Sequence, residues 1–237
     1  MNSNVNIIDN TPLHSAPAYC FKEELANTII HIIGAILSIV GLIMLISNSE
    51  MNINTIEVNT ASNLTRIICF SIYGASLIML FLASSLYHST SHIQLKKLFK
   101  LFDHCAIYFL IVGTYTPLLL ISLKGPLGYW SAALIWAVAI SGVVFKIKIR
   151  HTKTPQKYKV ISLSTYLGMG LISISLLGEL YKVLPLEALY YFATGGLIYC
   201  LGVFFYVKKE IPYTHAIWHL FVLAAAMCHF FMIYLYV

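Results

Sequence analysis

Several imidazole, hydroxyl and carboxyl groups in this sequence have the types and the spacing of a hydrolytic metal site. His215 and His219 are four positions apart, as are Ser84 and His88, and such residues lie on the same face of a helix. Imidazole suits Zn²⁺, and three histidines with one water form a common catalytic zinc set. A third histidine must come from another helix; His88 and His31 are the candidates, and we predict His88.

Three further polar residues share one face of an early helix. Glu24, Asn27 and His31 are spaced i, i+3 and i+7 in the segment EELANTIIH. A polar face inside a bilayer is costly unless it points at partners within the protein. We therefore expect these residues to hydrogen-bond the metal-bound histidines and not to ligate the metal themselves.

The elements that position these groups are membrane helices. Of the 237 residues, 59% are hydrophobic and only 10% are charged, whereas a soluble domain carries about 25% charged residues. The apolar runs are too long and too continuous for β-barrel strands. The sequence predicts an all-α membrane protein, a seven-transmembrane helix bundle in a single domain 1–237 with a polar N-terminal tail over 1–22. Its spans are Leu25–Ser47, Leu64–Tyr87, Ala106–Leu123, Tyr129–Ile147, Val160–Leu177, Leu186–Val207 and His215–Val237.

Lysine and arginine predict the orientation of the bundle. Twelve of the 15 basic residues fall in the tail and the even-numbered loops, and only Arg66, Lys124 and Lys182 fall on the other side. Basic residues collect in cytoplasmic loops, so we expect the N-terminus to be cytoplasmic and the C-terminus outside. The four helices with candidate residues then bring them to one depth, near the cytoplasmic face.

Asp103 has two interpretations at this point. It is expected in the first turn of the third span, where the helix dipole and the lysines before it would stabilise a carboxylate. Alternatively, it faces the metal site. His229 lies about 15 Å further along the helix than His219, so we predict that it is structural.

Other features favour no separate chemistry. The net charge of +6 is explained by topology and contact with anionic lipid, and neither a nucleic-acid partner nor an obligate protein partner is inferred. The five cysteines have no CxxC spacing, which argues against a disulfide framework. A haem protein would need pairs of histidines that face each other as axial ligands, and a transporter would need ionisable groups at several depths. Neither function is favoured, because the ionisable groups are expected to gather at one depth. Glycines in the fifth and sixth spans are expected to pack helices within the bundle; they are Gly168, Gly170, Gly195, Gly196 and Gly202.

Four stretches resemble the hemolysin III family, the bacterial branch of the progestin and adipoQ receptor family. They are EELANTIIHIIG from Glu23, SSLYHST from Ser84, DHCAIYFLIVGTYTPLLL from Asp103, and HAIWHLFVLAAAMCHFF from His215. The resemblance implies zinc held by three histidines near the cytoplasmic side, the N-inside topology, and kinship with alkaline ceramidases. It also implies a multi-pass protein of the bacterial cytoplasmic (inner) membrane. The chain lacks the long N-terminal region of the hormone-receptor branch, so no hormone-binding role is carried over.

Two functions stay open from the sequence. The first is an intramembrane zinc-dependent hydrolase of a lipid amide or ester, in which Asp103 and Ser84 are the catalytic residues and membrane lipids are the partners. Asp103 would position or deprotonate the water, and Ser84 would hydrogen-bond the water or the oxyanion. The alternative is a non-enzymatic, zinc-stabilised, receptor-like regulator of membrane lipid or energy state, in which Asp103 would close the site as a fourth ligand.

Overall fold

The computed structural model describes residues 20–51, 62–150, 155–208 and 211–237, and all regular secondary structure in this part of the chain is helical. Seven of the helices are long and apolar enough to cross a membrane, which confirms the seven-span prediction. A π-helical turn, η2 (Leu118–Leu123), follows Pro117. The helices are α1 (Phe21–Met51), α2 (Asn63–Ser89), α3 (Ile93–Pro117), α4 (Gly125–Ile149), α5 (Pro155–Val183), α6 (Leu186–Val207) and α7 (Thr214–Tyr236).

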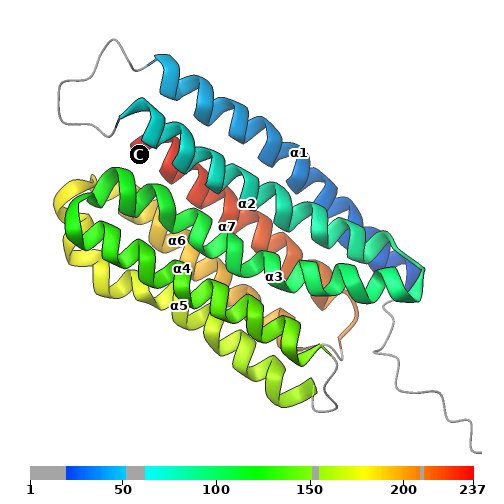
Figure 1. Ribbon diagram of the computed structural model, residues 1–237. Helices are drawn as coiled ribbons and strands as arrows, with labels where there is room; N and C mark the ends of the chain where they lie inside the picture. Colours follow the sequence, from blue (N-terminus) through cyan, green and yellow to red (C-terminus); the bar gives the residue numbers. More distant parts are fainter. Residues whose placement is uncertain (1–19, 52–61, 151–154, 209–210) are drawn as a thin grey trace, which may run out of the picture.

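The helices form a closed ring in which each one contacts the next along the chain and α7 returns to α1. Figure 1 shows α1, α2 and α7 at one side of the bundle and α4 and α5 at the other. The contacts of α5 with α3, α4 and α6 are sparse compared with those between α1 and α2 or between α6 and α7. The bundle is therefore tightly packed around α1, α2 and α7 and more open toward α5.

One end of the bundle, which we call the basic end, carries the starts of α1, α3, α5 and α7. Its exposed lysines include Lys22, Lys97, Lys148, Lys157 and Lys208. Two lysines counted in the predicted loops, Lys153 and Lys209, lie outside the described residues, as does the tail before Cys20.

The start of α3 differs from the prediction. The helix begins at Ile93, where the ring of His92 accepts a hydrogen bond from the backbone N–H of Leu95. Asp103 therefore lies ten residues inside α3, so its expected place in the first turn is wrong. The helix-dipole interpretation fails with it, since that effect fades within the first turn. Lysine and leucine are good helix formers, and together they extend α3 beyond its apolar run.

Glycines set the distance between α6 and α7. A Cβ at Gly202 would lie 2.8 Å from side-chain atoms of Trp218 and Phe221, and one at Gly195 would lie 2.4 Å from the ring of His229. These two glycines thus pack helices within the bundle, as expected. Gly168, Gly170 and Gly196 have no such neighbour within 4 Å, so their predicted role in close packing is wrong.

Substitution at Gly202 tests this contact. Gly202→Ala is expected to lower the free energy of unfolding by about 1–3 kcal/mol, because the added methyl overpacks the contact with α7. The matched control is Gly178→Ala, where a Cβ meets nothing within 4 Å; it should be neutral or stabilising by up to about 1 kcal/mol. Denaturant unfolding of both variants in detergent measures the difference, and equal stabilities would contradict the packing.

Candidate metal centre

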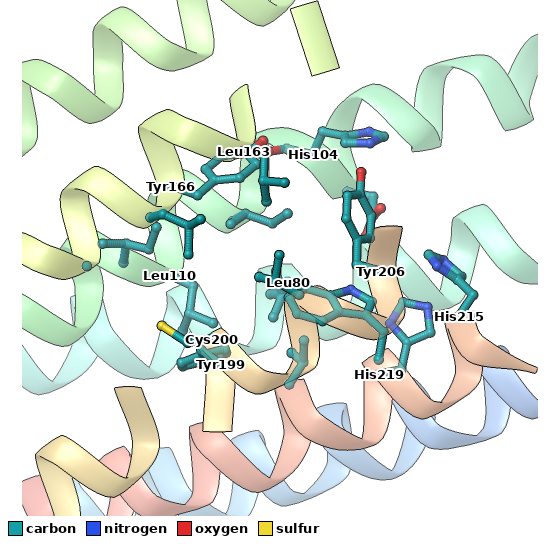
Figure 2. A pocket seen from close by; sticks show the side chains of 18 of the residues that line it. Leu80, His104, Leu110, Leu163, Tyr166, Tyr199, Cys200, Tyr206, His215 and His219 are labelled. Carbon is teal, nitrogen blue, oxygen red and sulfur yellow. Dashed lines mark hydrogen bonds between the residues drawn. The ribbon is translucent and has the colours of Figure 1, made fainter. Parts of the chain in front are cut away.

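The start of α7 fixes the direction of its two histidines. The Thr214 hydroxyl donates to the carbonyls of Lys208 and Ile211 at 2.7 and 2.9 Å, which holds the helix terminus against the end of α6. From there His215 and His219 project from one face of α7, as Figure 2 shows. Because they are one turn apart, both rings reach toward the same point.

His88 of α2 meets these two rings inside the bundle. Each of the three histidines offers one nitrogen, and these nitrogens all lie within 4.8 Å of one another. The Nε2 atoms of His88 and His219 are 3.1 Å apart. Ligands at about 2.0–2.1 Å from a tetrahedral metal ion would be separated by about 3.3–3.4 Å. The three imidazoles therefore fit a shared metal ion, and His88, His215 and His219 can hold one.

The contacts of α1 orient His88 for this role. Nδ1 of His88 lies 2.6 Å from Oε2 of Glu24 and 3.3 Å from Nδ2 of Asn27. The shorter contact, to a carboxylate, assigns the proton to Nδ1, which donates to Glu24 and leaves the Nε2 lone pair directed at the metal position. Lys96 of α3 donates to the other oxygen of Glu24 at 2.8 Å. A carboxylate behind a ligating histidine is a common arrangement in metal sites.

His31 contacts the centre through its ring. It is buried, and its ring stands at 89° to that of His219 with the centroids 4.0 Å apart. Neither of its nitrogens has a hydrogen-bond partner among the described residues. His31 thus shares the face of Glu24 and Asn27, but its contact with His219 is packing and not a hydrogen bond.

Asp103 and Ser84 lie beside the three histidines. The Asp103 carboxyl is close enough to His88 and Ser84 to interact electrostatically with both. The Ser84 hydroxyl is fully buried and lies near the Asp103 carboxyl, without a well-formed hydrogen bond to any described residue. Asp103 is not a member of the group whose ligand atoms converge. The centre therefore combines three converging imidazoles with an adjacent carboxyl and a hydroxyl beside that carboxyl.

A cavity of about 710 Å³ begins at this centre and runs into the bundle. Asp103, His215 and His219 line one end, and Phe192 and His229 line the other. Figure 2 shows the intervening wall, to which Leu110, Leu163, Tyr166, Tyr199 and Cys200 contribute. The wall is mostly apolar, so the interior suits a hydrocarbon chain better than a polar solute.

His229 marks the far end of the cavity, away from the metal position. Its Nε2 lies 3.2 Å from the carbonyl oxygen of Phe192, and its ring contacts those of Phe192 and Tyr199. It does not belong to the converging histidines.

The lysines on α3 contribute to the centre, although they are not among the site residues predicted from the sequence. Lys96, Lys100 and Asp103 are spaced i, i+4 and i+7, so they share one helix face. This spacing is visible in the sequence, but a predicted loop before Asp103 conceals the shared face. With α3 starting at Ile93, this face brings Lys96 to Glu24 and Lys100 to the wall of the cavity.

Comparison with known proteins supports a family assignment. The family model described as haemolysin-III related matches residues 19–230. The chain is 43% identical to Hemolysin-3 of Bacillus cereus over 216 residues, and this alignment covers 91% of this chain and 92% of that protein. It is 38% identical over 218 residues to the Hemolysin-3 homolog of Bacillus subtilis, covering 92% and 96%. It is also 37% identical over 171 residues to the human monocyte to macrophage differentiation factor, covering 70% and 68%. The chain belongs to the haemolysin-III related family of multi-pass membrane proteins.

Proposed function

We propose that the protein is an intramembrane, zinc-dependent hydrolase of a lipid amide or ester. The observation that carries the proposal is the convergence of three imidazoles beside an acid that is not itself among the converging ligands. Three protein ligands with one open position are typical of catalytic zinc, whereas structural zinc fills its fourth position with a protein ligand. The geometry favours an open site over one that Asp103 closes.

The side chains around the centre supply the remaining roles of a hydrolase. A bound Zn²⁺ supplies Lewis acidity and lowers the pKa of its water to about 7. Asp103 takes a proton from the attacking water and returns it to the leaving group. Ser84, which lies beside Asp103 without a well-formed hydrogen bond, donates a hydrogen bond to the oxygen of the scissile carbonyl. Glu24 keeps the proton of His88 on Nδ1.

The cavity indicates the form of the substrate. It is long, largely apolar and continuous with the histidines, so an acyl chain can lie in it while its carbonyl lies beside Asp103. Leu171 and Cys200 line the cavity and are also exposed on the surface of α5 and α6. A lipid can therefore enter from the bilayer between these two helices. With the N-terminus in the cytoplasm, the centre faces the inner leaflet of a bacterial cytoplasmic membrane.

A lipid-product screen tests the proposal. The purified protein in vesicles is incubated with lipid amides and esters, with and without a zinc chelator, and released fatty acid is measured by mass spectrometry. The proposal expects release that stops with the chelator and returns with added zinc. Release that is insensitive to chelation would contradict it.

The ligand assignment has its own test. His88→Ala, His215→Ala and His219→Ala should each lower zinc content well below one ion per chain, because two imidazoles hold the ion poorly. The control is His229→Ala, which should leave zinc content unchanged. Elemental analysis of purified protein measures the ratio, and full occupancy in a His215→Ala, His219→Ala double variant would exclude these ligands.

Asp103→Asn separates catalysis from stability. The substitution keeps the shape of the side chain but removes the base, so hydrolysis should fall by about 100-fold or more while zinc content is retained. Glu187→Gln, at the start of α6, is a matched control that should remain active. An Asp103→Asn protein with normal turnover would remove the general base from the mechanism.

The acyl-chain position can be tested by filling the cavity. Gly196 lines the cavity, and a Cβ there would meet nothing within 4 Å. Gly196→Leu should therefore slow turnover of long-chain substrates more than that of short-chain ones. Gly178→Leu, on the exposed surface of α5, is the control. If turnover depended on the length of the acyl chain to the same extent in both variants, the acyl chain would not lie beside Gly196.

A further inference from the structure

Three lysines from three different helices gather where the cavity meets the basic end. Lys100 of α3 and Lys159 of α5 line the cavity. Lys146 of α4 is close enough to both of them, and to Asp103, to interact electrostatically. We call these three residues the mouth lysines. None of them is used by the proposed hydrolytic mechanism.

Aromatic residues of the cavity wall hold two of the mouth lysines in place. The Nζ atom of Lys100 lies 5.9 Å from the ring centroid of Tyr87, and that of Lys146 lies 5.8 Å from the ring centroid of Tyr166. Tyr87 and Tyr166 both line the cavity. Such cation–π contacts favour ammonium groups at the ring faces, so these two lysines stay at the wall instead of extending into solvent.

The charge of the mouth lysines is not balanced by the described residues. None of them forms an ion pair within 4 Å in the described part of the chain, where the carboxylates found in ion pairs with lysine are Glu24 and Glu179. Among the described residues, Asp103 is the carboxylate that interacts with Lys100 and Lys146. Glu23 also lines the cavity, from α1, but it is not among the groups that interact with the mouth lysines. Three ammonium groups thus face one carboxylate.

We propose that the mouth lysines bind the phosphate of an anionic phospholipid whose acyl chain occupies the cavity. Lysine binds phosphate as a point charge, and anionic phospholipids are plentiful in the cytoplasmic leaflet. The apolar cavity wall continues directly from these lysines, so one molecule can place its headgroup at the lysines and its chain among the apolar side chains. The lipid's role as a substrate rests on the proposed function, whereas its binding at the lysines does not.

Binding of an ether-linked phosphatidylglycerol tests the proposal independently of hydrolysis, because this lipid has no ester carbonyl. Native mass spectrometry of the detergent-purified full chain gives its affinity and that of the ether-linked phosphatidylcholine with the same chains. The test variant is Lys100→Gln, Lys146→Gln, Lys159→Gln. The matched control is Lys97→Gln, Lys148→Gln, Lys157→Gln, which removes the same charge from the same three helices at exposed positions outside the cavity.

The proposal expects the wild type to prefer phosphatidylglycerol, and the test variant to lose about tenfold or more of that affinity while the control loses little. Lys159→Gln alone, at an exposed position, should show a smaller loss in the same direction if the triple variant does not fold. Equal losses in the test and control triple variants would show general surface attraction and overturn the site. Competition by glycerol phosphate at the same concentrations as the lipid would overturn the lipid as the source of the phosphate.

Hydrolysis assays keep this inference separate from the proposed function. Lysine-dependent binding without hydrolysis of any lipid would leave the site standing and contradict the hydrolase. Hydrolysis that proceeds equally on zwitterionic lipids, and unchanged in the test variant, would leave the hydrolase standing and contradict the site.

Discussion

The Glu24 carboxylate makes the contact on which the rest of the centre depends. It accepts from Nδ1 of His88 on α2 at 2.6 Å and from Nζ of Lys96 on α3 at 2.8 Å, so a single side chain of α1 joins three helices. It also fixes the tautomer of His88, because the proton that it holds on Nδ1 leaves Nε2 free for a metal ion. Without this contact, nothing would favour the tautomer of His88 that directs the Nε2 lone pair toward His219.

The packing of the ring determines what that centre can reach. α7 is held close to α6 by Gly195 and Gly202, which places His215 and His219 opposite α2. On the other side α5 packs loosely, and the volume that it leaves unfilled becomes the cavity. The proposed hydrolase would need both the tight packing around the histidines and the loose packing beyond them, because a metal site requires fixed ligands and a lipid chain requires space.

The sequence predicted the parts of this structure that follow from helical periodicity and from the cost of polar groups in lipid. Ser84 and His88, His215 and His219, and Glu24 and Asn27 could each be assigned to one helix face from their spacing, and the directions of the spans then brought these faces to one depth. The start of α3 could not be predicted, since lysines that precede an apolar run have the same pattern in a loop and in a helix that extends beyond the membrane. The cavity was also out of reach, because Gly170 and Gly196 read as packing residues until their neighbours are known.

X-ray absorption at the zinc edge of the purified protein tests the central claim most directly, because it reports the ligands of the ion without reference to any substrate. The account predicts one zinc with three imidazole nitrogens at about 2.0–2.1 Å and one oxygen at a similar distance. A sulfur ligand, or a spectrum in which fewer than three imidazoles scatter, would contradict a site built from His88, His215 and His219.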